Sequence, residues 1–236
     1  MSRSFLITGT DTGVGKTTVA SAIAAALALR GHDVGVAKPV ETGCEPGADG
    51  ERLPADALLL RWAAGRGDPV DRICPWRFSA PLSPNVAARR EHADFQLAEV
   101  IRAVRAVIAG SEIALVEGAG GLLSPLTDGA TFADIARACN LRVIVVVGNR
   151  LGALNHARLT LDWASDHGLD VAGYVVNALA ESADLAAQTN VAELRALLGP
   201  SLGVFPFVSD LGRTAADRQR LADAAERAIE LRFLVR

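Results

Sequence analysis

Apolar and polar stretches alternate along the chain in a pattern that predicts strands separated by helices. The apolar run at residues 5–7 stops at a polar Thr-Gly pair. Residues 16–29, in contrast, are rich in Ala, Leu and Ile and end at Arg30-Gly31, a signal typical of a helix C-terminus. We therefore expect a first strand, a loop and a first helix in this order.

The same alternation continues through the rest of the sequence. Helical spacing of apolar positions predicts helices at residues 54–64 and 95–108. Short apolar runs predict strands at residues 34–37, 113–116, 143–147, 171–176 and 202–205. The middle three runs are continuous rather than alternating, as in strands that are buried on both faces of a parallel sheet. Two segments rich in Gly, Pro and charge are expected to be long loops, residues 43–51 and 65–84.

Strands that alternate with helices predict an α/β fold with a doubly wound, mainly parallel sheet and helices on both faces. Ligand sites of such sheets lie at the carboxyl ends of the strands. With 236 residues, the chain is long enough to bury a large core, and we expect residues 1–236 to form a single domain.

Composition narrows the classes of function. Basic and acidic residues nearly balance, 24 against 27, and no long basic run is present, so a nucleic-acid partner is not expected. The three cysteines lack the spacing of a zinc cluster or a disulfide framework, which favours a reducing cytoplasm. The longest mostly apolar run, residues 19–29, is too short to cross a bilayer, so no membrane attachment is expected.

The sharpest motif is the segment Gly-Thr-Asp-Thr-Gly-Val-Gly-Lys-Thr at residues 9–17, between the first strand and the first helix. In a phosphate-binding loop (P-loop), backbone N–H groups cradle phosphates, the lysine reaches the terminal phosphates and the threonine hydroxyl meets Mg²⁺. Here Lys16 and Thr17 hold those positions, although Gly9 and Gly15 enclose five residues where the usual pattern has four. The motif predicts a nucleoside triphosphate site and a fold of the P-loop NTPase type.

Three charged residues follow the predicted strands or open a helix, and each has two interpretations. Lys38 comes directly after the second strand, where it either stabilises an oxyanion in the crevice or is simply solvated. Glu117 follows the third apolar strand and is either a ligand of Mg²⁺ or of a cationic group, or part of a turn. Asp56 lies in the first turn of a helix, where the helix dipole alone can account for it.

Two asparagines likewise have two interpretations each. Asn155 stands near the start of a helix, either as an N-cap or in a turn whose N–H groups hold a substrate carboxylate. Asn177 ends a strand, where its amide either pairs with the edge of adenine or forms a turn.

Five segments together resemble the dethiobiotin synthetase family of the biotin pathway. They are the P-loop, Ala-Lys-Pro-Val-Glu-Thr-Gly at 37–43, Val-Glu-Gly-Ala-Gly-Gly at 116–121, Gly-Asn-Arg-Leu-Gly-Ala-Leu-Asn-His at 148–156 and Gly-Tyr-Val-Val-Asn at 173–177. Their order and spacing agree with the family over residues 4–208. Two departures are Gly13, where many members have Glu, and Thr42, where Ser is frequent.

The resemblance implies a ligase that uses ATP and Mg²⁺ to join CO₂ or bicarbonate to 7,8-diaminononanoate. A carbamate and then a carbamic-phosphoric anhydride are the implied intermediates, and dethiobiotin, ADP and phosphate are the products. The resemblance also implies a homodimer in which the turn at residues 151–155 of the neighbouring chain holds the substrate carboxylate.

The resemblance assigns roles to individual residues. The implied catalytic residues are Lys16, Lys38 and Thr12. The implied nucleotide-binding residues are Gly13, Val14, Gly15, Lys16, Thr17, Thr18, Glu117, Gly118, Asn177, Pro206, Phe207 and Val208. The implied substrate-binding residues are Thr42, Leu151, Gly152 and Asn155, and the implied metal ligands are Thr17, Asp56 and Glu117.

A nucleotide-switch ATPase that binds a protein or DNA partner is the alternative, since related α/β folds use unusual P-loops of this kind. Such switches usually carry an additional lysine near the start of the loop. The corresponding residues here are Thr10, Asp11 and Thr12, which favours the ligase.

Overall fold

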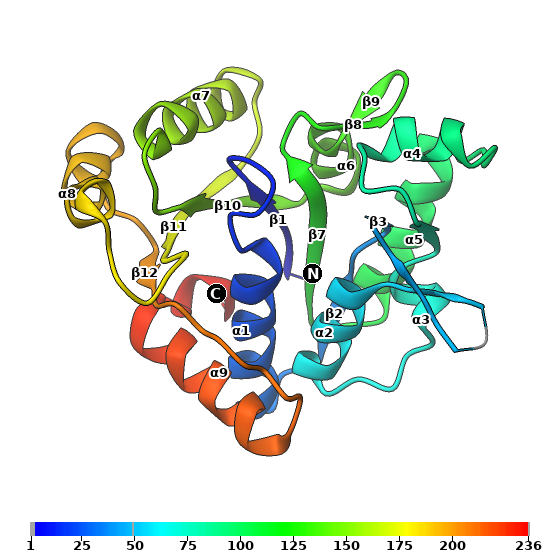
Figure 1. Cartoon of the computed structure of the whole chain (residues 1–236), viewed down its shortest axis with the longest axis horizontal. Helices are drawn as coiled ribbons and strands as arrows, with labels where there is room; N and C mark the ends of the chain where they lie inside the picture. The colour runs from blue at the N-terminus through cyan, green and yellow to red at the C-terminus, as the bar shows by residue number, and fades with distance from the viewer. Residues whose placement is uncertain (1–2, 49, 236) are drawn as a thin grey trace.

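A six-stranded parallel sheet forms the centre of the computed structural model, which describes residues 3–48 and 50–235 (Figure 1). The strand order is β12-β11-β10-β1-β7-β2. The strands are β1 (Arg3–Gly9), β2 (Val34–Ala37), β7 (Ile113–Gly121), β10 (Arg142–Gly148), β11 (Val171–Asn177) and β12 (Gly203–Phe205). Because β1 is central and the chain winds outward on both sides of it, the doubly wound fold is confirmed.

Helices cover both faces of the sheet (Figure 1). Adjacent residues on β1 show the division, since Phe5 and Ile7 point to one hydrophobic core and Leu6 points to the other. The first core is closed by α1 (Lys16–Leu29), α2 (Ala55–Ala64), α9 (Ala215–Ala228) and α10 (Arg232–Val235). The second is closed by α4 (Pro84–Arg90), α5 (Leu97–Ala109), α6 (Phe132–Cys139), α7 (Ala153–Asp166) and α8 (Leu185–Leu198).

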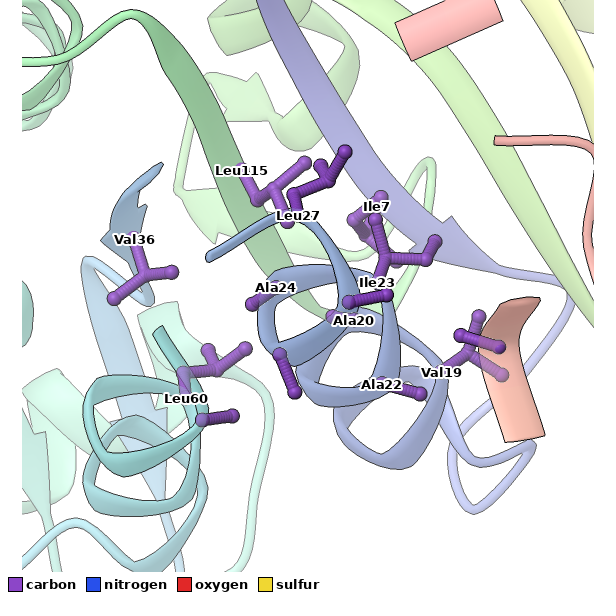
Figure 2. Close-up of a cluster of buried hydrophobic side chains, with 14 of the residues drawn as sticks. Ile7, Val19, Ala20, Ala22, Ile23, Ala24, Leu27, Val36, Leu60 and Leu115 are labelled. Atoms are coloured by element: carbon purple, nitrogen blue, oxygen red, sulfur yellow. The ribbon is translucent and has the colours of Figure 1, made fainter. Parts of the chain in front are cut away.

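Helix α1, which follows the P-loop, is buried on nearly all sides. Figure 2 shows Ile23 beside Ile7 of β1 and Leu27 beside Leu115 of β7, while the alanines of α1 face other neighbours. Small alanine side chains allow α2 and α9 to pack closely against α1. A helix packed on so many sides gives the P-loop a rigid base.

The segments expected to be long loops contain short elements, so the prediction for residues 43–51 and 65–84 was wrong in part. A small parallel pair joins β3 (Val40–Thr42) to β6 (Trp76–Phe78), and β4 (Glu45–Pro46) pairs with β5 (Arg52–Leu53). The chain also forms α3 (Val70–Ile73), β8 (Pro125–Thr127) and β9 (Ala130–Thr131). Elements of two to four residues are too short to show a periodic pattern.

The first predicted helix has the expected bounds, Lys16–Leu29, whereas the ends of α2 and α5 differ from the predictions by one or two residues. The helix expected from residue 95 begins at Leu97, because Gln96 and Glu99 form a capping box there. Among the described residues, the helices α3, α4, α6, α8, α9 and α10 were not predicted. Within the described ranges, no helix combines the length and the apolar character needed to cross a membrane.

Candidate active site

A cleft of about 350 Å³ opens at the carboxyl ends of β1, β2 and β7. Its walls come from the P-loop, from the segment after β2, from the start of α2 and from β7. The lining residues are Thr12, Gly13, Gly15, Lys16, Thr17, Thr18, Lys38, Glu41, Thr42, Asp56, Glu117, Ala119 and Gly120. The structure thus brings most of the predicted nucleotide-binding residues of the P-loop, both lysines and the carboxylates of Asp56 and Glu117 to one place, whereas the Val14 side chain is buried in the hydrophobic core.

The backbone of the P-loop requires glycine at two positions. Gly13 and Gly15 have φ angles of +72° and +85°, in the left-handed region. At Gly15 a Cβ atom would also collide with the side-chain amide of Asn177, whereas nothing lies near Gly13. The amide nitrogen of Asn177 donates to the carbonyl of Val14 at 3.0 Å, so the strand end of β11 holds the loop in place.

The chain has only two lysines, Lys16 and Lys38, and both line the cleft. Lys16 donates to the carbonyl of Asp11 at 3.1 Å, and burial lowers the pKa of this lysine to about 8. An ammonium with few polar partners is available to bind phosphate oxygens. Lys16 therefore fits its expected role at the terminal phosphates.

Lys38 is buried, 4% exposed, and joins two carboxylates. Its Nζ atom lies 2.5 Å from Glu117 Oε1 and 2.9 Å from Asp56 Oδ2. Burial alone would lower the pKa of Lys38, but the Glu117 and Asp56 carboxylates outweigh it and raise the pKa. The interpretation of Lys38 as a solvated surface residue is wrong, because the residue remains charged inside the site.

The oxygen atoms around Lys38 fit a magnesium ion. The Thr17 hydroxyl donates to Glu117 Oε1 at 2.7 Å, and Glu117 Oε2 is buried with no hydrogen-bond partner among the described residues. Two carboxylates and a hydroxyl are the hard donors that Mg²⁺ accepts, with water and substrate phosphates as its other ligands. The described residues contain no group of three or more His, Cys, Asp or Glu side chains suited to a metal, so the donor set depends on the threonine and on phosphate.

Two local expectations need correction. Glu117 does not follow a strand, since β7 continues to Gly121 and Glu117 lies inside it. Asn155 is not an N-cap, because α7 begins at Ala153 and Gly152 occupies the cap position with φ +91°. Gly152 marks this helix start, because its positive φ angle is a conformation that glycine adopts readily.

Several of the expected binding residues lie outside the cleft. Residues 206–208 follow β12 directly, and β12 pairs with β11 so that Phe205 is opposite Asn177. The Oδ1 atom of Asn177 is buried and has no partner in the described part of the chain. Gly118 lies against the ring of Phe132, beneath the cleft.

The turn before α7 lies beside the start of the P-loop. Leu151 at this turn is 84% exposed, and Arg150 pairs with Asp11 of the P-loop at 2.6 Å. The structure therefore links the turn to the P-loop but does not bring Leu151, Gly152 and Asn155 into the cleft.

Glu41 is a cleft residue that the sequence analysis missed. It is buried, and its carboxylate accepts the backbone N–H groups of Asp56 and Ala57 at 3.0 Å each. Burial, reinforced by the neighbouring Asp56 carboxylate, raises the pKa of Glu41 to about 7. The signal was its position three residues after Lys38, in a segment already identified as part of the site.

Comparison with known proteins supports the same family. A family model described as an AAA domain matches residues 3–215. An ATP-dependent dethiobiotin synthetase of Anaeromyxobacter dehalogenans is 43% identical over 214 residues, covering 90% of this chain and 94% of the relative. The chain belongs to the dethiobiotin synthetase family. A synthetase of the same name from Thermodesulfovibrio yellowstonii is 38% identical, with 90% of this chain and 92% of the relative covered.

Solved structures agree with the fold of this dethiobiotin synthetase family member. A ParA family ATPase from Chlorobium tepidum has a TM-score of 0.55 at 12% identity, covering 98% of this chain and 92% of its own. Chloroplast FtsY from Physcomitrella patens has a TM-score of 0.52 at 20% identity, covering 95% of this chain and 65% of its own. At such identities these structures support the fold alone. The resemblance inferred from the five sequence segments is confirmed by the relatives.

Proposed function

We propose that this chain is an ATP-dependent dethiobiotin synthetase whose residues 1–236 form a single P-loop domain. It joins CO₂ to 7,8-diaminononanoate and forms dethiobiotin, ADP and phosphate. The observation that carries this proposal beyond family membership is the placement of both lysines of the chain, Lys16 and Lys38, in one cleft with two carboxylates.

The chemistry explains why the site is so strongly charged. One amine of the substrate captures CO₂ as a carbamate and releases a proton. A carbamate oxygen then attacks the γ-phosphorus of ATP, the bond to ADP breaks, and a carbamic-phosphoric anhydride forms. The second amine attacks the carbonyl carbon, loses its proton, and expels phosphate as the ring closes. Such phosphoryl transfer depends on positioning and on charge around the phosphate oxygens.

The residues of the cleft take the corresponding roles. Lys16 binds the terminal phosphates, and Lys38 supplies positive charge to the carbamate and the transferring phosphoryl group. The hydroxyls of Thr12 and Thr42 line the same cleft and orient the reacting oxygens. The pairing of Lys38 with Asp56 and Glu117 supports this assignment, because it keeps the lysine protonated and restrained.

Magnesium is held by Thr17, Asp56 and Glu117. When bound, the ion neutralises charge on the phosphate oxygens and helps to orient the nucleotide. The buried, unpaired Glu117 Oε2 supports this role. A buried carboxylate oxygen without a partner is unfavourable unless a ligand satisfies it.

The nucleotide occupies the P-loop and extends toward β11. Backbone N–H groups of residues 13–18 bind the phosphates, and Gly118 lies beneath the cleft, between the lining residues Glu117 and Ala119. The free Oδ1 of Asn177 suits the exocyclic amino group of adenine, and residues 206–208 lie next along the sheet edge. These contacts account for the use of ATP.

The enzyme functions as a homodimer in the reducing cytoplasm. Exposed leucines support the interface, since Leu151 and Leu159 are 84% and 62% exposed near the start and middle of α7. In the dimer, the Leu151–Asn155 turn of one protomer holds the substrate carboxylate in the site of its partner. Sedimentation velocity tests this, with a dimer expected for the wild type and a monomer for Leu159→Asp. The free thiols of Cys44, Cys74 and Cys139 suit a reducing compartment.

Substrate dependence of ADP release tests the proposal. ADP release should require both the diamine and bicarbonate, because phosphoryl transfer waits for the carbamate. Rapid ADP release with neither present would contradict the ligase and support a nucleotide-switch ATPase instead.

A further inference from the structure

We propose that Glu41 is a positioning residue of the metal site, which fixes Asp56 by capping the helix that carries it. The inference rests on the proposed function, since it takes Asp56 as a ligand of Mg²⁺. Glu41 itself neither binds the ion nor touches the reacting atoms. Its effect passes through the backbone at the start of α2.

The cap comes from a distant segment because the helix has none of its own. Pro54 occupies the N-cap position of α2, and its side chain has no oxygen to accept an N–H group. Glu41 of β3 supplies both missing acceptors, with Oε1 on the N–H of Asp56 and Oε2 on the N–H of Ala57, each at 3.0 Å. Glu41 is 5% exposed, so water does not replace these bonds easily.

Both the side chain and the backbone of Asp56 are therefore held in place. Its side chain is bound by Lys38 at 2.9 Å, and its backbone is bound by Glu41. Lys38 and Glu41 belong to the same short stretch after β2, so a single stretch fixes the orientation of this carboxylate relative to Glu117. Residues that orient a metal ligand typically change metal affinity or activity by about 10- to 100-fold when they are removed.

Two variants separate the positioning role from a purely structural one. In Glu41→Ala both N–H groups lose their acceptor, whereas in Glu41→Gln the amide oxygen still accepts one. Glu99→Ala is the matched control, because the Glu99 carboxylate accepts the N–H of Gln96 at the start of α5, remote from the cleft. Each of the three substitutions removes or weakens a carboxylate that caps a helix, but only the two substitutions of Glu41 affect Asp56.

Isothermal calorimetry with a non-hydrolysable ATP analogue, titrated over a range of Mg²⁺ concentrations, gives the decisive readout. For Glu41→Ala we expect unchanged affinity for the analogue without metal. The Mg²⁺ concentration at which the analogue affinity has risen halfway to its Mg²⁺-saturated value should increase by about 10-fold or more. Glu41→Gln should lie between Glu41→Ala and the wild type, and Glu99→Ala should match the wild type.

An unchanged Mg²⁺ dependence in folded Glu41→Ala would overturn the inference, and so would an equal shift in Glu99→Ala. Melting curves establish that each variant is folded, and Glu41→Gln carries the test if Glu41→Ala does not fold. The proposed function fails separately, if wild-type protein with normal Mg²⁺-dependent binding makes no dethiobiotin. Wild-type binding that ignores Mg²⁺ would overturn the metal site and this inference together.

Discussion

The ammonium of Lys38 lies 2.9 Å from the carboxylate of Asp56, although the two residues belong to different parts of the fold. Lys38 follows β2, and Asp56 lies in the first turn of α2. The same ammonium contacts Glu117 of β7 at 2.5 Å. One lysine therefore connects three segments at the place where phosphoryl transfer is proposed to occur.

Replacing Lys38 should separate binding from chemistry. We expect Lys38→Ala to keep its affinity for an ATP analogue and to lose turnover by about 10²-fold or more, because the charge acts mainly on the transition state. Analogue titration and steady-state kinetics measure the two quantities. Near-normal turnover with normal nucleotide affinity would reject the role of Lys38.

Lys16 should show the opposite behaviour. Its ammonium is held at the P-loop by the carbonyl of Asp11 and, within residues 3–48 and 50–235, is not paired with a carboxylate in the way that Lys38 is. Lys16→Ala is therefore expected to lose nucleotide binding while the fold remains intact. Fluorescence titration with a labelled nucleotide measures the loss, and circular dichroism provides the control. Wild-type affinity in this variant would contradict the proposed phosphate contact.

Only two lysines are present, so lysine-selective ¹³C labelling gives two side-chain signals in NMR. In ligand-free, metal-free protein, the Lys16 signal should titrate near pH 8, with the charged form below this value, because burial lowers its pKa. The Lys38 signal should not titrate in this range, because the Glu117 and Asp56 carboxylates overcome the effect of burial and raise its pKa. Substitution of each lysine by arginine assigns the signals, and a Lys38 signal that titrates near pH 8 would contradict the described pairing.

Gly13 and Gly15 of the P-loop form a matched pair for substitution. Both have positive φ angles, so alanine at either position carries a strain of about 1–2 kcal/mol. Gly15→Ala also collides with Asn177, whereas Gly13→Ala has open space. We expect a much larger loss of melting temperature and nucleotide affinity in Gly15→Ala, with partial recovery when Asn177→Ala is added. Equal losses in the two single variants would contradict this account.

Much of the fold could be predicted because buried parallel strands leave a clear signal. The continuous apolar runs at 143–147 and 171–176 correspond to β10 and β11. The helices α8 and α9 were missed because few of their positions are buried, Asn190 and Leu194 in α8 and Leu221, Ala222, Ala224 and Ala225 in α9, which leaves only a weak apolar pattern. The short pair β3 and β6 depends on contacts between distant segments, which no local pattern records.

Site residues could be predicted where a residue type with a known chemical role stands in a known motif or directly after a predicted strand. The P-loop motif identified Lys16, and the position after a predicted strand identified Lys38 and Glu117, whereas the metal role of Asp56 came only from the family resemblance; all four residues line one cleft. Glu41 was missed because it acts on backbone N–H groups of a helix that lies 15 residues further along the chain. The pairing of Lys38 with both carboxylates likewise required the geometry.

The most direct test of the central claim is mass spectrometry of the product formed from 7,8-diaminononanoate, ATP, Mg²⁺ and ¹³C-bicarbonate. The account predicts a cyclic urea that carries one labelled carbonyl carbon, formed in equal amount with ADP and phosphate, and absent in Lys38→Ala at early times. ATP hydrolysis without a labelled product would contradict it.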